Sequence, residues 1–545
     1  MSRRIELCGV VKLKDCLIRS EYLIPNINEN DKIPSWDGYI EVYESKNKDN
    51  KKSELLSRIP VQVKGQMNPN IFKEQIKYSV DKADLNNYLN DGGVMFFVVC
   101  VSNYDNYRIY YETLSPLKLI RYIKNMEDRN SISISLKTFP KDNIEEFTDI
   151  FLNFSDDINK QASEKILSIN DFMKNRPLGY DSFNVQCRSI KYKHAIDFFL
   201  ENEVTVYIKH SDTEISTPID QIRFKTFDQD VSFPILIEYK KYYSNYKLSY
   251  SIEGTKLLIG NSTSILYPKE EKKAIFNFKV QGTLSQRIDD TKFYLGLLNK
   301  KYFTISGEKS YNVDIPFDET ESVKQIEYFN KYLEYLLELE KTLSILKIKN
   351  ELDFKDFTKK DEEHINIIIS SILYNEPQDL IFDKEIEEDA IFQSIKICNI
   401  YILLLFYKIK NGKYSVINFF DEKISINFQS RKDNIVYNAS IYLYLKKEHF
   451  LNVSNIDYDI IYKSFFNLDA NEELFGLTNQ LILNMIDAYD ENKYEILLNT
   501  ALKVLYWLIE NDHITKAEIY KLNILQIIKR KRKLSDSEIS QLLDN

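Results

Sequence analysis

Two stretches of the sequence decide the fold that we expect: residues 35–42, SWDGYIEV, and residues 59–65, IPVQVKG. Each alternates apolar and polar side chains in a run rich in β-branched or aromatic residues, which predicts a half-buried strand. The first strand begins beside Asp37, and the second carries Gln62 and Lys64 two positions apart. Because side chains two positions apart on a strand point to the same face, Gln62 and Lys64 should lie together, next to Asp37 if the strands are neighbours.

The residue types at these positions are those that metal-dependent cleavage of a phosphodiester requires. Such a site needs a carboxylate to hold Mg²⁺, further oxygen ligands beside it, and a cation near the attacking water. Asp37 would supply the carboxylate, while Gln62 and the backbone carbonyl of Val63 would supply further ligands. Lys64 would orient or deprotonate the water, or stabilise the negative charge growing on the phosphate. The two stretches therefore predict a site for Mg²⁺ (or Mn²⁺).

The order of the segments around these strands resembles the PD-(D/E)xK restriction-endonuclease-like superfamily, and within it a bacterial phage-defence-associated branch with a Gln-x-Lys motif. In that branch a helix carrying a glutamate precedes an Asp-Gly strand and a Gln-x-Lys strand. A strand–helix step, a buried apolar strand and an aromatic strand ending in Leu-x-Pro then follow. The matching positions here are Glu6, Asp37-Gly38, Gln62-Val63-Lys64 and residues 76–89, 94–101 and 109–116. The resemblance covers roughly residues 1–165.

This resemblance implies an N-terminal α/β nuclease-like core with Asp37, Gln62, Lys64 and Glu6 as catalytic residues. It implies a Mg²⁺-dependent endonuclease, acting on DNA more readily than on RNA, that serves as the effector of a bacterial anti-phage defence system. The rest of the chain would then sense a phage-encoded trigger, bind a partner defence subunit or build a homo-oligomer.

Two positions depart from the family pattern and leave alternatives open. Trp36 replaces the proline of the Pro-Asp pair, and Gln62 stands where many members have an acid. A neutral amide oxygen binds Mg²⁺ more weakly than a carboxylate does. One alternative is therefore a catalytically weak or inactive nuclease-fold subunit that binds nucleic acid or scaffolds a defence complex. Another is an interaction protein that recognises a phage protein through its β-rich segment.

Net charge, cysteine spacing and the length of apolar runs limit which partners and which cellular compartment we expect for this protein. The 545 residues carry a net charge of -9, so any contact with nucleic acid must be local rather than spread over a basic surface. The five cysteines form no CxxC pair, and the N-terminal segment is polar and charged, which predicts a cytoplasmic protein without a structural zinc site. The longest apolar runs are too short to span a bilayer, so no membrane contact is expected.

Three segments with different patterns predict a multidomain α+β protein. Residues 1–170 alternate helix and strand patterns and would form the α/β nuclease-like domain. Residues 171–317 contain short alternating runs between turns, which are typical of a β-rich sandwich or barrel. Residues 318–545 return to helical spacing, with a small β element near residues 414–445. In this mainly α-helical domain we expect helices over residues 323–348, 365–373, 390–408, 480–488 and 494–510.

Four other groups of residues have a structural explanation that we favour over a functional one. Glu41 shares the face of Asp37, but a cross-strand salt bridge is more common at such a position than a metal ligand. The three acids before His364 are typical of the negative charge found at a helix N-terminus. The basic run at residues 529–533 suits a solvated helix end, and the tyrosines between 239 and 250 suit packing better than base stacking.

Overall fold

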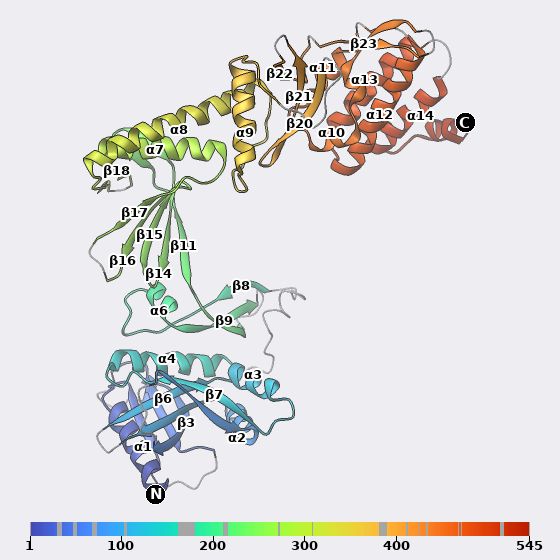
Figure 1. Cartoon of the computed structure of the whole chain (residues 1–545). Helices are drawn as coiled ribbons and strands as arrows, with labels where there is room; N and C mark the ends of the chain where they lie inside the picture. The colour runs from blue at the N-terminus through green and yellow to red at the C-terminus, as the bar shows by residue number, and fades with distance from the viewer. Residues whose placement is uncertain are drawn as a thin grey trace. The chain divides into compact units, whose positions relative to one another are not determined.

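The computed structural model describes residues 2–543 apart from 30–34, 47–51, 68–72, 103–105, 162–179, 211–215, 271–272, 308, 381–389, 410–411, 423, 432–433, 467, 470 and 513–516. The chain folds into two compact units (Figure 1). Met1–Gln229, Ser249–Lys256 and Pro268–Glu271 form the first unit; Asp230–Leu248, Leu257–Tyr267 and Lys272–Asn545 form the second. The division into three domains stays a prediction, and its boundary at residue 170 lies outside the described residues.

A seven-stranded sheet forms the centre of the first unit (Figure 1). Its strand order is β1-β2-β3-β5-β6-β7-β4, and every neighbouring pair is antiparallel except β3 and β5, which are parallel. A parallel pair needs a crossover, which β4 and the helix α2 supply here. The bounds are β1 (Leu23–Ile27), β2 (Gly38–Tyr43), β3 (Leu55–Met67), β4 (Gln75–Asp81), α2 (Lys82–Asn90), β5 (Val94–Val101), β6 (Tyr107–Leu114) and β7 (Ser131–Thr138).

Helices cover both faces of this sheet, because successive apolar side chains along its strands point to opposite faces and are buried on each. One face, which includes Val61, packs against α1 (Ser2–Leu17) and α4 (Ile144–Lys160). The opposite face, which includes Phe96, packs against α2 and α3 (Pro116–Met126). Every residue of β5 is buried because this strand contributes to both cores, as its uninterrupted apolar run predicts.

Three further sheets follow along the chain. The sheet β10-β9-β8 belongs to the first unit with helix α6, and the sheet β11-β14-β15-β16-β17 has residues in both units. In the second unit, the sheet β13-β12-β18-β19 shares a core with helix α7. The bounds are β8 (Tyr180–Asn184), α6 (Ala195–Glu201), β9 (Glu203–His210), β10 (Ser216–Arg223), β11 (Thr226–Val231), β12 (Ile235–Ile237), β13 (Lys240–Tyr243), β14 (Tyr246–Ser251), β15 (Gly254–Ile259), β16 (Thr263–Pro268), β17 (Ile275–Phe278), α7 (Leu284–Lys300), β18 (Tyr302–Ile305) and β19 (Tyr311–Asp314).

This middle region is rich in strands, as its sequence predicts. Its strands belong to three sheets, and buried residues of β12, β15, β16 and β18 share one core. The helix α7 fills this core through Phe293 and Leu297, which are both fully buried. The sequence-based prediction missed this helix, because residues 284–300 lie within a series of short strands and were included in the β-rich segment.

The last part of the chain is mainly helical and contains the sheet β20-β21-β22 and the hairpin β23-β24. The small β element expected near residues 414–445 is therefore confirmed. The bounds are α8 (Glu319–Ile345), α9 (Lys359–Ile368), β20 (Ala390–Ile397), β21 (Ile400–Lys408), β22 (Tyr414–Asn418), β23 (Ile426–Gln429), β24 (Val436–Ala439), α10 (Lys447–Asn452), α11 (Tyr458–Lys463), α12 (Glu472–Asn492), α13 (Glu495–Asn511), α14 (Ala517–Lys531) and α15 (Asp536–Leu543).

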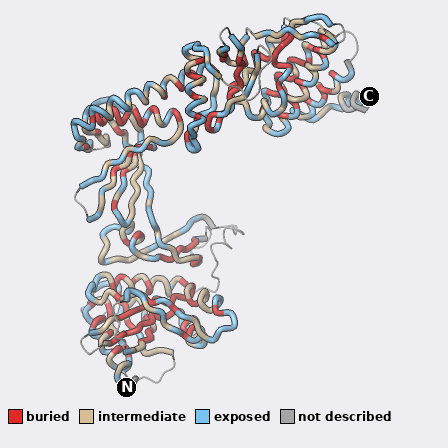
Figure 2. Tube along the Cα trace, in the orientation of Figure 1, coloured by how far each residue is buried: buried red, intermediate tan, exposed pale blue. Residues whose placement is uncertain are grey.

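The helix predicted over residues 390–408 is wrong, because β20 and β21 form an antiparallel hairpin there. The strands pair up to Ile397 and Ile400, and Cys398 in the turn has a positive φ of 48°. β-branched and aromatic side chains dominate both strands, and they favour an extended backbone over a helix. Within the described residues no helix combines the length and the apolar character that crossing a membrane requires. Figure 2 shows buried residues concentrated on the central strands and on the inner faces of the helices.

Candidate metal and phosphate site

Asp37 lies at the entrance of β2, where backbone hydrogen bonds from both sides fix it. Its N–H donates to the carbonyl of Val61 at 2.9 Å, and the N–H of Asn28 donates to its carbonyl at 2.7 Å. Gly38 follows with a φ of 142°, and a Cβ at this position would lie 2.2 Å from the carbonyl oxygen of Asn26. The glycine of the Asp-Gly pair is therefore required for β1 to approach the strand that carries the acid.

Gln62 and Val63 both donate hydrogen bonds to one carboxylate oxygen of Asp37. The side-chain amide of Gln62 donates to Oδ2, and the N–H of Val63 donates to the same oxygen at 2.6 Å. Gln62 is only 3% exposed and lies directly opposite Phe96 of β5, so its amide is held in place. The structure thus brings two of the predicted site residues into direct contact.

The backbone carbonyl of Val63 lies on the edge of β3 where the predicted site needs it. In an extended strand the N–H and C=O groups of one residue point to the same edge, and the N–H of Val63 points to Asp37. The ladder between β2 and β3 ends at the pair of Gly38 and Val61. The carbonyl of Val63 therefore lies beyond the last pair of that ladder, on the side of Asp37.

Lys64 follows on the same strand face as Gln62, opposite Val98 of β5. Its side chain is partly exposed. In the part of the chain that the structure describes, its ammonium forms neither a hydrogen bond nor an ion pair. Lys64 thus supplies a cation that no described acid neutralises, two residues beyond the amide that contacts Asp37.

Glu6 lies in the first half of α1, which crosses β3 one residue beyond Lys64. A Cβ on Gly65 would lie 2.8 Å from the Cα of Glu6, so this glycine permits the close approach of helix and strand. Burial raises the pKa of Tyr78 on β4, and the negative charge of Glu6 raises it further. Glu6 is exposed, and no hydrogen bond or ion pair joins it to Asp37, Gln62 or Lys64 within the described residues.

A polar cluster beside Asp37 has no counterpart in the sequence-based prediction. The hydroxyl of Ser35 donates to Asp84 of α2 at 2.6 Å and accepts from Asn87 at 3.0 Å. Burial raises the pKa of Tyr88 on the same helix, and the charges of Asp84 and Asp37 raise it further. Ser35 and Asp84 are 49 positions apart, so no local pattern signals their contact.

The residues around Asp37 fit a divalent cation in part. Within the described ranges, no group of three or more His, Cys, Asp or Glu side chains could hold a metal ion. The donors are one carboxylate, the amide of Gln62 and the carbonyl of Val63, which do not complete a coordination shell. Mg²⁺ commonly keeps several waters and binds through one or two carboxylates plus substrate phosphates. This set therefore fits a cation that a substrate phosphate helps to hold.

Two of the alternative candidate positions have structural partners. Glu41 forms a salt bridge at 3.1 Å with Arg58, its partner across β2 and β3, as favoured from the sequence. Asp361 accepts from the N–H of Thr358 at 2.8 Å and from the N–H of Cys398 at 2.6 Å. Its carboxylate thus caps α9 and fixes the turn of the β20–β21 hairpin.

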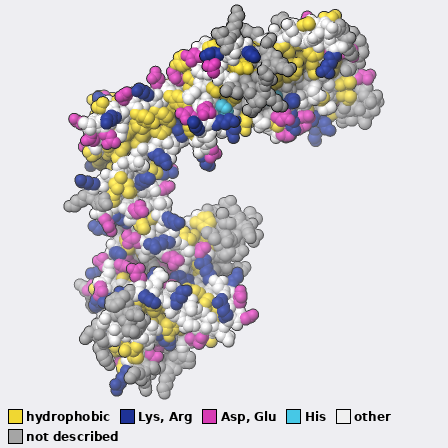
Figure 3. Space-filling model, in the orientation of Figure 1, with side chains coloured by type: hydrophobic (Ala, Val, Ile, Leu, Met, Phe, Trp, Pro, Cys, Tyr) yellow, Lys and Arg dark blue, Asp and Glu magenta, His cyan; other side chains and the backbone are white. Residues whose placement is uncertain are grey.

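Two of the five residues in the basic run at 529–533 form ion pairs. Arg530 binds Asp490 through two hydrogen bonds of 2.8 and 2.6 Å, and Arg532 binds Glu538 in the same bidentate way. On the face drawn in Figure 3, Lys and Arg side chains are interspersed with Asp and Glu. Among the tyrosines between 239 and 250, Tyr243 donates to Asp290 at 2.5 Å and packs in the core of α7, as favoured from the sequence.

No protein-family model matches this chain, and comparisons with curated proteins and with solved structures found no match either.

Proposed function

We propose that the N-terminal part of the first unit cleaves phosphodiester bonds of nucleic acid with the help of Mg²⁺ or Mn²⁺. The observation that carries this proposal is the contact of Asp37 with Gln62 and Val63, beside Lys64 on the same strand, which pairs with no acid among the described residues. A carboxylate, two neutral oxygen donors and a free cation at one strand edge are what such a reaction needs.

Each residue has a separate role in this proposal. Asp37 would hold the cation, with the amide oxygen of Gln62 and the carbonyl of Val63 as further ligands. The amide of Gln62 has to rotate for this, because its NH₂ group faces Asp37 in the structure. When bound, the cation would supply an activated water and neutralise charge on the phosphate.

The two charged groups nearby complete the proposed site. Lys64 would bind the phosphate oxygens, where its positive charge stabilises the charge that develops during attack. Glu6 would add negative charge on the side of α1. The preference for DNA and the role in anti-phage defence follow from the resemblance to the restriction-endonuclease-like superfamily and belong to the same proposal.

A cleavage assay with the full chain tests this proposal. Supercoiled plasmid, linear duplex DNA, single-stranded DNA and RNA are incubated with Mg²⁺, with Mn²⁺ or with EDTA. We expect cleavage only with metal, and a loss of about 100-fold in Asp37→Asn and in Lys64→Met. Asparagine keeps an oxygen that can accept the N–H of Val63, so Asp37→Asn removes the charge while preserving that hydrogen bond.

Matched variants control for general effects of charge. Asp128→Asn and Lys77→Met change exposed residues outside the candidate site, and both should cleave like the wild type. Equal cleavage by the wild type, Asp37→Asn and Lys64→Met would overturn the proposal.

A second candidate function is binding of nucleic acid without cleavage. It is favoured by one observation, namely that Asp37 already has protein donors, Gln62 and Val63, at the oxygen a metal would use. In that case binding would be unchanged by EDTA, and no substrate would be cut under any metal condition.

A further inference from the structure

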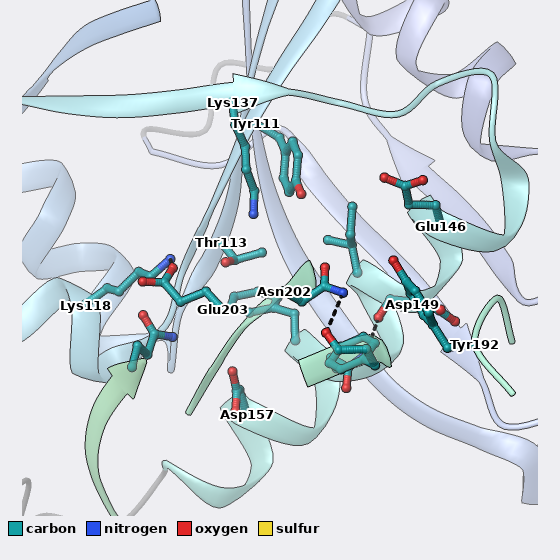
Figure 4. Close-up of a pocket in the computed structure, with 15 residues that line it drawn as sticks. Tyr111, Thr113, Lys118, Lys137, Glu146, Asp149, Asp157, Tyr192, Asn202 and Glu203 are labelled. Atoms are coloured by element: carbon teal, nitrogen blue, oxygen red, sulfur yellow. Dashed lines mark hydrogen bonds and ion pairs between the residues drawn. The ribbon is translucent and has the colours of Figure 1, made fainter. Parts of the chain in front are cut away.

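A second polar site lies on the other face of the sheet from Gln62, where α4 and the segment from α6 to β10 enclose a cavity. Its volume is about 80 Å³. Because one water needs roughly 10–15 Å³ of such space, the cavity has room for several waters or for one tetrahedral oxyanion. Figure 4 shows Lys137 and Tyr111 extending into this cavity from the sheet, with Thr113 beside them.

Three groups on the sheet side of the cavity are hydrogen-bond donors that have no protein acceptor among the described residues. Tyr111 and Thr113 lie two positions apart on β6, and Lys137 lies opposite Tyr111 on β7, so all three share one face. The ammonium of Lys137 lies 5.2 Å from the centre of the Tyr111 ring. Within the described residues, neither this ammonium nor the two hydroxyls hydrogen-bonds to a protein acceptor, and no carboxylate pairs with Lys137.

The acids on the opposite wall, by contrast, already have donors. Glu146 pairs with a lysine at 2.9 Å, and Asp149 accepts from the hydroxyl of Ser189 and the N–H of Ile190, each at 2.6 Å. Asp157 accepts from the hydroxyl of Tyr207 at 2.7 Å. These carboxylates therefore do not supply the missing partner of the ammonium across the cavity.

The second lysine in the cavity, Lys118, is paired with carboxylates and serves as a comparison for Lys137. Lys118 contacts Glu112 and lies 3.6 Å from Glu203. Burial acts to lower its pKa, but these two carboxylates outweigh burial, so the pKa of Lys118 is raised.

For Lys137 the effect of burial outweighs the attraction of the nearby carboxylates, and its pKa is lowered. The residue as a whole is exposed because the cavity opens to solvent, yet protein surrounds its ammonium closely enough that burial lowers its pKa. The attraction of Glu112 and Glu203 is opposed by the repulsion of Lys118 and Arg223. Of the two lysines that line the cavity, Lys137 therefore lacks a counter-ion among the residues that the structure describes.

We propose that this cavity binds a small oxyanion, the phosphate group of a free ion or of a nucleotide, through the ammonium of Lys137 and the hydroxyls of Tyr111 and Thr113. A phosphate supplies several strong acceptors for these three donors. The bound anion would touch β6 and β7 on one side and the segment from α6 to β10 on the other. This inference does not depend on the proposed cleavage reaction.

Isothermal titration of the full chain tests this site without any cleavage readout. Inorganic phosphate, a nucleoside monophosphate and acetate are titrated separately into the protein in a buffer whose only small anion is chloride. We expect phosphate to bind the wild type, Lys137→Met to weaken binding at least tenfold, and Tyr111→Phe to weaken it by a smaller factor. Lys124→Met, at an exposed position of α3, should leave binding unchanged.

The two sources of the phosphate are distinguished by their relative affinities. A nucleoside monophosphate that binds at least tenfold more tightly than phosphate assigns the cavity to a nucleotide, and equal affinities assign it to the free ion. Absence of binding by any phosphate compound, or equal binding by the wild type and Lys137→Met, would overturn the inference.

A stability measurement separates binding from folding. Because Lys137 forms no ion pair with a described residue, Lys137→Met should unfold at the same temperature as the wild type, or higher, in phosphate-free buffer. Phosphate should raise the unfolding temperature of the wild type only. An unfolding temperature of Lys137→Met that is lowered in phosphate-free buffer would assign Lys137 to folding and would also overturn the inference.

Discussion

A direct hydrogen bond between Gln62 and Asp37 changes the role that the sequence alone predicts for Gln62. From the sequence they are two oxygen donors for a cation, but in the structure the NH₂ group of Gln62 donates to Asp37. Gln62 is almost fully buried, so this contact stabilises the fold whether or not a cation is present. A carboxylate at position 62 would need a cation or a shared proton between the two side chains, whereas the amide does not.

The substitution Gln62→Glu tests this difference at a single residue. It places two carboxylates in contact, so without metal we expect the free energy of unfolding to fall by about 1–3 kcal/mol at pH 8. Mg²⁺ or Mn²⁺ should restore most of that loss, because a cation can then bind between the two acids. Thermal unfolding in EDTA and in excess metal measures both effects.

Gln66→Glu is the matched control, since Gln66 lies further along the same strand and away from Asp37. It should respond to metal no more than the wild type does. An unfolding temperature of Gln62→Glu that metal leaves unchanged would contradict the assignment of a cation site beside Asp37.

At the scale of elements, hydrogen bonds between segments distant in sequence join α4 to β9 and to the segment before it. The polar side of α4 holds the segment before β9 through Asp149 and Asn153, and holds β9 itself through Asp157. Burial raises the pKa of Asp157, although its hydrogen bonds from Tyr207 and Thr205 act to lower it. The contact between helix and strand is therefore sensitive to pH.

The contribution of Asp157 to the free energy of unfolding decreases as the pH rises. Because the pKa of Asp157 is raised on folding, the folded state binds more protons than the unfolded state above the ordinary pKa, and stability falls as the pH rises through the folded value. Asp157→Asn removes this loss and should unfold at a higher temperature than the wild type at pH 8. The difference should shrink toward pH 4, whereas the exposed control Asp128→Asn should show no such trend.

The contact of α9 with the β20–β21 hairpin gives a second prediction at this scale. Asp361→Ala removes the acceptor of the N–H groups of Thr358 and Cys398, which should lower the free energy of unfolding by about 1–3 kcal/mol. The exposed neighbour Glu363→Ala should change it by less than about 0.5 kcal/mol. If no metal binds at Asp361, Zn²⁺ or Mg²⁺ should change the stability of the wild type and of Asp361→Ala by the same amount, and chemical denaturation with and without metal checks both points.

At the scale of the whole molecule, each compact unit has its own apolar cores. The two cores of the seven-stranded sheet lie in the first unit, and the three cores built around α7, α8 and α12 lie in the second. Units with separate cores are expected to unfold in separate transitions.

Two glycine substitutions test this independence. In Gly65→Ala a Cβ would lie 2.4 Å from the carbonyl oxygen of Ile5, so α1 must shift, at a cost of about 1–3 kcal/mol. In Gly476→Ala nothing lies within 4 Å of the new Cβ, and alanine should stabilise α12 by about 0.5–1 kcal/mol. Scanning calorimetry should show two transitions, one lowered by the first substitution and the other raised by the second. A single transition shifted by both would contradict the prediction.

The sequence by itself determined the elements whose pattern is local. Alternation defined β2 and most of β3, the continuous apolar run defined β5, and the spacing of Gln62 and Lys64 placed them on one strand face. The helix prediction failed over residues 390–408 because the long apolar run outweighed the β-branched and aromatic side chains that favour strands, and β21 pairs there with both β20 and β22.

Tertiary structure alone decided which side chains meet. The contacts of Gln62 with Asp37 and of Ser35 with Asp84 join residues 25 and 49 positions apart, and the cavity around Lys137 is lined by residues from Tyr111 to Gln221. Such contacts depend on the register of strands and on how closely helices approach them. Gly65, for example, permits the close approach of α1 to β3. Periodicity carries no information about either quantity, because it describes each element by itself. Local pattern could thus place residues on a strand or a helix, but it could not show that Gln62 contacts Asp37 or that Ser35 contacts Asp84.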